Sequence, residues 1–250
     1  MASTLIVDQL QKTGGSTTAL TLPTSNASAS EFLQNDGAGA LSWAAVDAGG
    51  GFLGYVVYTG SGTYTPGTSG HADVTKIVVE VQGAGGSGGK GNTNGAAMGG
   101  GAAGGYARKF LSMTDITTAT VTVGTGGASM DTYDTAGNAG GLSKFEKATG
   151  SGSFTDVIGN GGGGGVYSAY GRTAGGTGTG GDLNVQGGEG NAGGPSNWGG
   201  SSQFGQGGSN KWNGQLTTST ASGYGSGGGG GYQTPSAAGA DGVVIIWEYK

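Results

Sequence analysis

Alternation of apolar and polar residues predicts short β-strands along much of the chain. Residues 75–82, TKIVVEVQ, show the pattern most clearly, because Ile77, Val79 and Val81 fall on one face of an extended segment. No segment has the 3.6-residue period of a helix of normal length. The predicted strands are residues 52–58, 75–82, 106–113, 118–124, 142–148, 153–158 and 243–250.

Glycine-rich and polar turns between these strands predict how they pair. Residues 106–113 and 118–124 are expected to form one hairpin, and residues 142–148 and 153–158 another. The first and last strands lie near the two ends of this region and are expected to be brought together. Short strands joined in this way favour an all-β fold, an antiparallel sandwich or a jelly-roll-like domain.

The N-terminal residues 1–46 differ from the rest, because they are rich in Ser, Thr and Ala and hold only short β-like pieces. These pieces are residues 4–10, 19–23 and 40–43, with the turn signal NDGAG at residues 35–39. A segment this short cannot bury a core of its own. We therefore expect an extended fibre or attachment arm that needs partner chains.

Glycine changes this picture, because it supplies 64 of the 250 residues. It is concentrated in the domain at residues 47–250, above all in an insertion at residues 159–242 before the last strand. Glycine loses more backbone freedom on folding than any other residue, so ordered glycine tracts need compensating interactions. Backbone hydrogen bonds between closely packed tracts can supply them, and polyglycine helices with three residues per turn are one open possibility. Collagen is excluded, because glycine does not recur at every third position and proline is scarce.

The net charge and the residue types present restrict the function. The formal net charge is −5 and there is no basic block, so nucleic acid is not expected as a partner. No apolar run approaches the length of a membrane-spanning helix, so no membrane insertion is expected. The chain has no cysteine and a single histidine, His71, so we expect no disulfide, no metal site and no cofactor.

The stretch VVEVQGAGGSGGKG at residues 78–91 spells G-x-G-x-x-G at Gly83, Gly85 and Gly88, which is the pattern of a dinucleotide-binding loop. That loop must open a helix and precede an acidic residue about 20 positions later. Here more glycine follows, and Arg108 stands at the acidic position. These glycines are therefore expected to allow close packing of the backbone.

No set of residues has the pattern of a catalytic site, so we expect no enzyme activity. His71 stands alone in a loop. Asp131 and Asp134, in MDTYDTAGN, lack the alternating spacing of a calcium-binding EF-hand loop. A role in turn formation is favoured for them, and a bound calcium ion is the alternative.

Aromatic and polar residues beside the glycine tracts of the insertion are the candidates for a binding surface. Rigid rings among small, adaptable polar groups are typical of recognition surfaces. The alternative is that the rings cover flat glycine surfaces and supply the packing that glycine lacks. The candidates are Tyr167, Tyr170, Arg172, Asn197, Trp198, Gln203, Phe204, Lys211, Trp212 and Asn213.

The order of several sequence pieces is informative. SGTYTPGTSGHADVTKIVVEVQGAGGSGG is followed by GGYARKFLSMTDITTATVTVGTGG, then by GGLSKFEKATG, and at the end by GADGVVIIWEY. In this order they resemble the glycine-rich domain of bacteriophage tail fibre proteins. The upstream LPTSNASASEFLQNDGAGALSW resembles a fibre segment that often precedes such domains, and the insertion is similar in style to T-even-type phage adhesins.

The resemblance implies a virion protein, a tail fibre or fibre-tip adhesin that binds a polysaccharide or an outer-membrane protein of the bacterial host. It also implies a homotrimer attached to other tail or fibre proteins. The contact loops would be residues 166–174, 195–198, 201–204 and 209–220. One alternative is a structural fibre or capsid decoration protein without receptor contact. Another is an ice-binding protein built from polyglycine helices, which would need a flat face of regularly spaced Thr or Ala and a fixed three-residue repeat.

Overall fold

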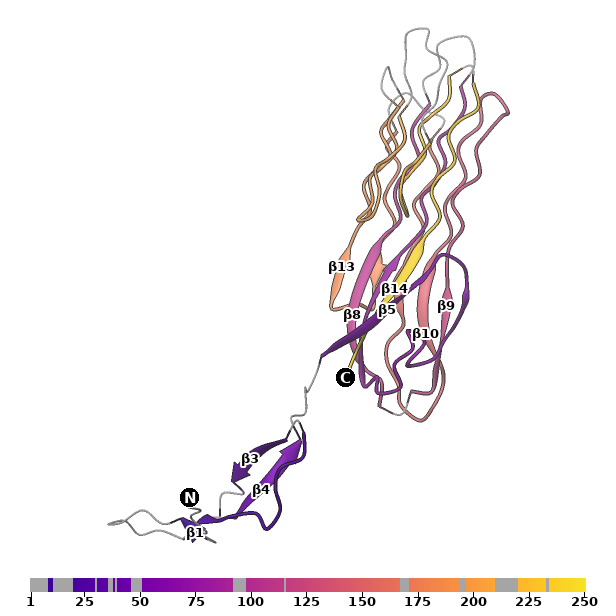
Figure 1. Ribbon diagram of the computed structural model, residues 1–250. Coiled ribbons are helices and arrows are strands. Elements are labelled where there is room, and N and C mark those ends of the chain that lie inside the picture. The colour runs from indigo at the N-terminus through magenta and orange to yellow at the C-terminus, as the bar shows by residue number, and fades with distance from the viewer. Residues whose placement is uncertain are drawn as a thin grey trace. The chain divides into compact units, whose positions relative to one another are not determined.

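The computed structural model describes most of the chain, and the regular elements in the described residues are β-strands (Figure 1). These residues fall in two compact units, Met1–Gly50 and Gly51–Lys250. None of them belongs to a long apolar helix of the kind that crosses a membrane. The described residues are 9–10, 20–29, 31–35, 38, 40–45, 51–91, 98–114, 116–166, 171–193, 197–209, 220–232 and 234–250.

The first unit contains two short antiparallel strand pairs. They are β1 (Gln9–Leu10) with β2 (Leu20–Thr21), and β3 (Glu31–Asn35) with β4 (Leu41–Ala45). The predicted strand at 40–43 corresponds to β4, whereas β3 was not predicted from its sequence. Phe32 and Leu33 of β3 expose much of their side chains, so this pair of strands lacks a buried face of its own.

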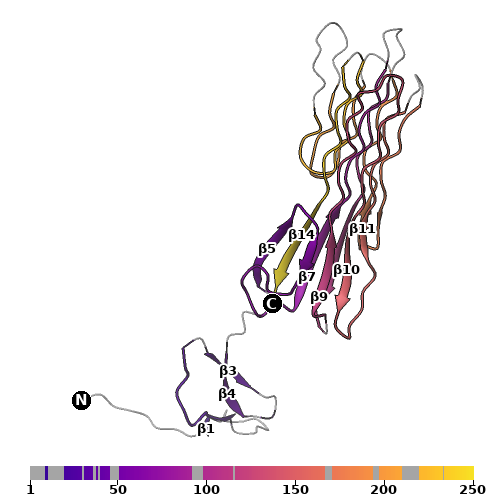
Figure 2. The ribbon, with the colours of Figure 1, turned by 90° about the vertical axis from the view of Figure 1, so that its right-hand side faces the viewer.

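The second unit contains a sandwich of two five-stranded antiparallel sheets, which confirms the predicted all-β sandwich (Figure 2). One sheet has the order β13–β8–β7–β14–β5, with β5 (Phe52–Tyr58), β7 (Lys76–Gln82), β8 (Tyr106–Ser112), β13 (Leu183–Val185) and β14 (Val243–Tyr249). The other has the order β12–β11–β10–β9–β6, with β6 (Gly62–Tyr64), β9 (Thr118–Thr122), β10 (Ser143–Thr149), β11 (Val157–Gly159) and β12 (Gly178–Thr179).

The strand pairing agrees with the sequence predictions at two points and differs at one. The first and last strands of the unit, β5 and β14, are neighbours, and β10 pairs with β11. The predicted hairpin of residues 106–113 and 118–124 is wrong, because β8 pairs with β7 and β13 while β9 lies in the other sheet. Met113 and Ile116 on the connection are buried in the core, which explains why the chain crosses between sheets here.

The core lies between the inner faces of the two sheets. Ile77, Val79 and Val81 of β7 are fully buried and belong to the same cluster as Phe145 of β10 and Ile246 of β14. The alternation that predicted β7 therefore also identified its core-facing side.

On the side of the sandwich away from the C-terminus, the strands continue as glycine-rich segments that run side by side (Figures 1 and 2). The segment that follows β7, residues 83–91, and the segment that precedes β8, residues 98–105, are buried along their whole described length. Further segments at residues 124–141, 159–166, 171–178, 186–193, 197–209, 225–232 and 234–242 surround them.

Backbone hydrogen bonds in this bundle change partner with a period of three residues. Every third N–H from Gly83 to Gly89 donates to residues 98–105. The N–H groups of Ala84, Ser87 and Lys90 donate to residues 135–141. Those of Gly85, Gly88 and Gly91 donate to Ala240, Ala237 and Gly231, and all these N···O distances are 2.8 to 3.1 Å. Three residues per turn is the geometry of a polyglycine or polyproline II helix, so the polyglycine arrangement is the one present.

Most of the glycines in the central segments leave no room for a side chain. A Cβ atom added to Gly101 would lie 2.1 Å from the carbonyl oxygen of Gly86, far inside van der Waals contact. Within residues 83–91 the only side chains beyond hydrogen belong to Ala84, Ser87 and Lys90, three residues apart. One face of this helix therefore carries side chains, and the other two meet neighbouring backbone.

Candidate functional site

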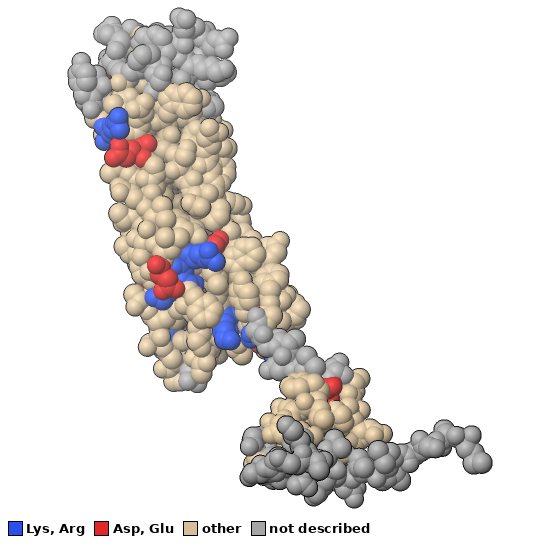
Figure 3. Space-filling model, turned by 90° about the vertical axis from the view of Figure 1, so that its left-hand side faces the viewer, with Lys and Arg blue, Asp and Glu red and all other residues tan. Residues whose placement is uncertain are grey.

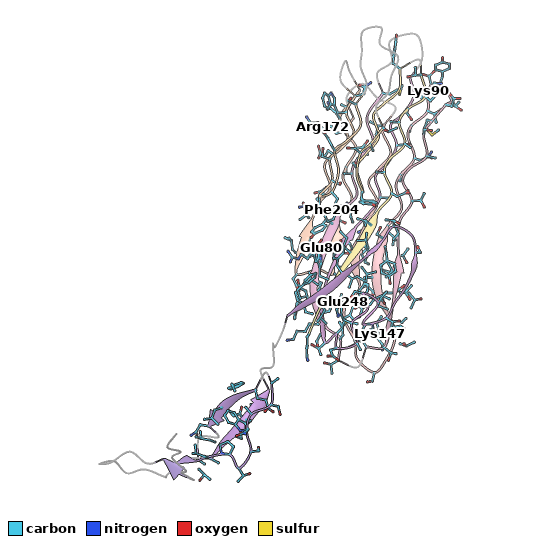
Figure 4. All side chains as sticks on the ribbon, in the orientation of Figure 1. Glu80, Lys90, Lys147, Arg172, Phe204 and Glu248 are labelled. Atoms are coloured by element: carbon cyan, nitrogen blue, oxygen red, sulfur yellow. The ribbon has the colours of Figure 1, made fainter. Side chains whose placement is uncertain are left out.

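The end of the glycine-rich bundle that lies farthest from the sandwich is the candidate functional site, and Figure 4 shows Lys90 and Arg172 near it. Backbone hydrogen bonds join distant parts of the chain there. The N–H of Gly99 donates to the carbonyl of Val166, and that of Gly230 donates to Asn197. Val166 and Asn197 belong to two of the predicted contact loops, so these hydrogen bonds place the described ends of both loops at this end of the bundle.

Lys90 lies at this end of the bundle and binds the loop that contains Asp131 and Tyr133. Its Nζ donates to the main-chain oxygen and to Oδ1 of Asp131, both at 2.7 Å, and lies 4.3 Å from the centre of the Tyr133 ring. The Lys90 side chain is almost completely buried. Sequence reasoning did not single out Lys90, although its place three residues after Ser87 marks it as a side chain on the one non-glycine face.

The two aspartates in the loop beside Lys90, Asp131 and Asp134, have structural roles. Asp131 forms the ion pair with Lys90. Asp134 has φ of 58°, the left-handed conformation that Asp tolerates in turns. These observations favour turn formation over a calcium site for the two residues.

Asn197 and Trp198 lie next to each other at this end but differ in exposure. Asn197 is buried, and its carbonyl accepts the hydrogen bond from Gly230 at 3.1 Å. The carbonyl of Trp198 accepts a hydrogen bond from Asn191 at 2.9 Å, whereas its side chain is 49% exposed. A fixed backbone therefore holds a tryptophan ring that solvent, or a ligand, can reach.

Arg172 contributes charge on an outer segment of the bundle. Its Nη1 lies 3.4 Å from Oε2 of Glu189, and both side chains are largely exposed. The neighbouring Thr173 exchanges two backbone hydrogen bonds with Gly190, which holds the two segments together. Figure 3 shows that charged residues are sparse on one face of the bundle and more frequent over the sandwich.

Gln203 and Phe204 lie elsewhere, at the junction of the bundle with the sandwich, where Figure 4 labels Phe204. The ring of Phe204 packs edge-on against Tyr106 of β8, with 5.7 Å between the ring centres. Gln203 lines a small hollow together with Tyr106 and Val185. The structure therefore separates Gln203 and Phe204 from Arg172, Asn197 and Trp198.

The pKa of Tyr106, beside this hollow, is raised to about 12 by burial, with a further contribution from Glu80, so its phenol stays neutral.

Five of the sequence candidates lie outside the described residues. They are Tyr167, Tyr170, Lys211, Trp212 and Asn213.

The comparisons with known proteins bear on the whole second unit. A family profile described as a glycine-rich domain matches residues 59–249, which is most of the chain. The chain belongs to this glycine-rich domain family. The matched region of the glycine-rich domain includes nine of the ten sandwich strands and the bundle. A search of curated proteins finds no match.

The glycine-rich domain uses the G-x-G-x-x-G stretch for backbone packing. A Cβ atom on Gly85 would lie 2.0 Å from the carbonyl oxygen of Ser226, and one on Gly88 would lie 2.1 Å from that of Gly229. Both glycines lie in a buried extended segment whose N–H groups donate to protein carbonyls. The N–H groups that would cradle a phosphate in a nucleotide-binding loop are therefore already used.

Proposed function

We propose that this protein is a bacteriophage tail fibre or fibre-tip adhesin, which binds the bacterial surface through the far end of its glycine-rich bundle. The observation that carries the proposal is the gathering of Arg172, Asn197 and Trp198 toward that end from separate segments. The family membership supports it only at the level of a glycine-rich domain. The resemblance of the ordered sequence pieces to phage fibres supplies the rest.

The chemistry of this end suits a sugar or a protein loop. The half-exposed ring of Trp198 offers a flat apolar face on which a pyranose can stack, and Arg172 offers hydrogen-bond donors to hydroxyl or carboxylate groups. Binding would need no covalent step. A bacterial polysaccharide and an outer-membrane protein both remain within this class of receptor.

The rest of the molecule would serve as scaffold and attachment in this proposal. The sandwich anchors one end of the segments that continue its strands, such as residues 83–91 after β7 and residues 98–105 before β8. The first unit would join the virion, or a preceding fibre protein, as part of a homotrimer. Localisation in the virion follows from the same proposal.

Competition with phage adsorption tests the adhesin role. Purified, folded full-length protein in excess is expected to slow adsorption of the phage that carries it to its host. Trp198→Ala should abolish most of this competition while the melting temperature stays close to wild type, because the side chain is half exposed. The matched control is Tyr224→Ala, an exposed aromatic residue bridged to Phe204 near the junction, which should compete like wild type.

The outcomes separate the two main candidate functions. If folded wild-type protein in excess leaves adsorption unchanged, the adhesin proposal is wrong and a structural fibre or capsid decoration role is favoured. If Trp198→Ala unfolds the protein, the ring serves packing instead of recognition.

An ice-binding role has one supporting observation, the three-residue period of the bundle. It also needs a flat row of Thr or Ala, and the exposed positions along residues 171–177 carry a mixed row of Arg172, Ala174 and Thr177. A thermal-hysteresis measurement on the purified protein separates this role from the others.

A further inference from the structure

The two sheets of the sandwich have outer faces of different character. On β9 and its neighbours, the outward positions carry Thr63, Thr120 and Glu146, which lie opposite one another in the strand register. Such polar side chains are typical of a face in contact with water. The outer face of the other sheet carries aromatic and aliphatic side chains.

A single row across that second sheet shows the difference. Tyr55 of β5 lies opposite Trp247 of β14, Trp247 lies opposite Val78 of β7, and Val78 lies opposite Phe110 of β8. Tyr55 and Phe110, at the two ends of the row, are 58% and 54% exposed. Four neighbouring strands therefore present one continuous apolar row to the outside. We call the outer face of the sheet β13–β8–β7–β14–β5 the apolar face.

The apolar face extends on both sides of this row. Phe52 packs against Trp247 and Tyr249, with ring centres 6.0 and 5.8 Å apart. At the opposite edge, Leu183 and Val185 of β13 are also exposed. Isolated exposed apolar residues need no explanation, but a contiguous patch of this kind marks an interaction surface.

The charged residues on the apolar face are of both signs and partly paired. Arg108 Nε lies 3.7 Å from Glu80 Oε1 within the face, and Lys250 Nζ lies 3.6 Å from Asp73 Oδ2 beside it. A second copy of the same face would therefore meet no strong field of like charge. Because both signs are present among the described residues of this face, it does not favour a partner of one charge.

The first unit also indicates that the partner of the apolar face is another copy of this chain. Its β3 exposes Phe32 and Leu33, and fifty residues with two short strand pairs cannot bury a core without other chains. Only residues 46–51 separate β4 from the first residue of β5. Six residues span at most about 20 Å when fully extended, so chains joined through their first units keep their β5 strands at a high local concentration.

We propose that the apolar face is the surface through which copies of this chain associate, each copy contributing the same face around a common axis. The proposal does not depend on host binding, because it concerns the sandwich and not the far end of the bundle.

Cysteine labelling of the full-length protein tests it, because the chain has no cysteine of its own. Val57→Cys places a thiol on the apolar face of the edge strand β5, and Thr63→Cys places one on the outer face of the edge strand β6. Both native side chains are exposed in the single chain. In the purified protein at high concentration, Cys at 57 should react with a maleimide several-fold more slowly than Cys at 63, and the mass in solution should be that of an oligomer.

Two further measurements identify what covers the face. Phe110→Glu, a change at an exposed position, should restore fast labelling at residue 57, whereas Thr120→Glu on the other sheet should not. A bismaleimide should link Val57→Cys chains to one another, whereas Thr63→Cys chains stay unlinked. Equal labelling at both positions in the purified protein would overturn the proposal and leave the face for a different protein. Slow labelling at residue 57 in a monomer would overturn it in favour of the chain's own first unit.

Discussion

Gly101 shows at the scale of a single residue why this chain needs so much glycine. Its missing side chain leaves room for the carbonyl oxygens of Gly86 and Ser87, which a Cβ atom would approach to 2.1 and 2.6 Å. These neighbours are backbone atoms held by hydrogen bonds, so they cannot swing aside as a flexible side chain can. The glycines of the bundle are therefore a steric requirement of the packing.

Gly101→Ala tests this requirement. Overpacking a core costs about 1 to 3 kcal/mol and occasionally more, and we expect the upper end or a failure to fold because the clash is with backbone. The control is Gly60→Ala, since a Cβ there meets nothing within 4 Å and surface changes of this kind stay within about 0.5 kcal/mol. Urea denaturation of the three proteins gives the comparison, and equal stability of all three would contradict the packing described.

At the scale of elements, a buried carboxylate ties the two sheets together. Glu248 of β14 accepts hydrogen bonds from Tyr64 Oη of β6 at 2.8 Å, from the Gly67 N–H at 2.9 Å and from Ser69. Burial, together with this bond to Glu248, raises the pKa of Tyr64 well above the ordinary value of 10.0. The neutral phenol is the form that the fold requires.

This raised pKa predicts a loss of stability in alkali. Below pH about 10 both states keep the phenolic proton, and above it the unfolded chain releases a proton that the folded chain retains, so the free energy of unfolding falls as the pH rises. Tyr64→Phe should lower stability at pH 8 by about 1.5 to 3 kcal/mol, the worth of a hydrogen bond to a charged group. It should also reduce the further loss between pH 8 and 11.

Thermal melts of wild type and Tyr64→Phe at both pH values measure the two effects. Some alkaline loss should remain in the variant, because burial also raises the pKa of Tyr58 and of Tyr106. Parallel melting curves with the same pH dependence in both proteins would rule out the assigned role of Tyr64.

The longer strands of the sandwich were predictable from the sequence because a half-buried strand repeats every two residues, as in TKIVVEVQ. The short strands β3, β12 and β13 were not predicted, and the last two lie within the predicted insertion. The partner of β9 was not predictable, because a short connection such as residues 113–117 can close a hairpin or cross between sheets. The polyglycine period was visible in Ala84, Ser87 and Lys90, but a repeat of three such positions is easily missed in a glycine-rich sequence. The gathering of Arg172 and Trp198 toward one end depends on hydrogen bonds between backbones, which leave no signal in side-chain type.

At the scale of the whole second unit, glycine gives a stiff bundle instead of a flexible linker. Segments such as residues 83–91 are buried and bonded on every side, although glycine-rich sequence is usually the composition of mobile chain. The proposed adhesin role depends on this stiffness, because a fixed bundle holds Trp198 and its neighbours in place before a ligand arrives. The apolar face adds a second use for the sandwich, the association of copies.

Hydrogen–deuterium exchange of the full-length protein, followed by mass spectrometry, tests the ordered bundle most directly. Peptides that cover residues 83–91 and 98–105 should exchange as slowly as the core strand β7, because each N–H from Gly99 to Gly105 and throughout residues 83–91 is bonded to another segment. The exposed turn at residues 59–61 should exchange fast in the same experiment. Fast exchange of both glycine segments, with β7 still protected, would contradict the account.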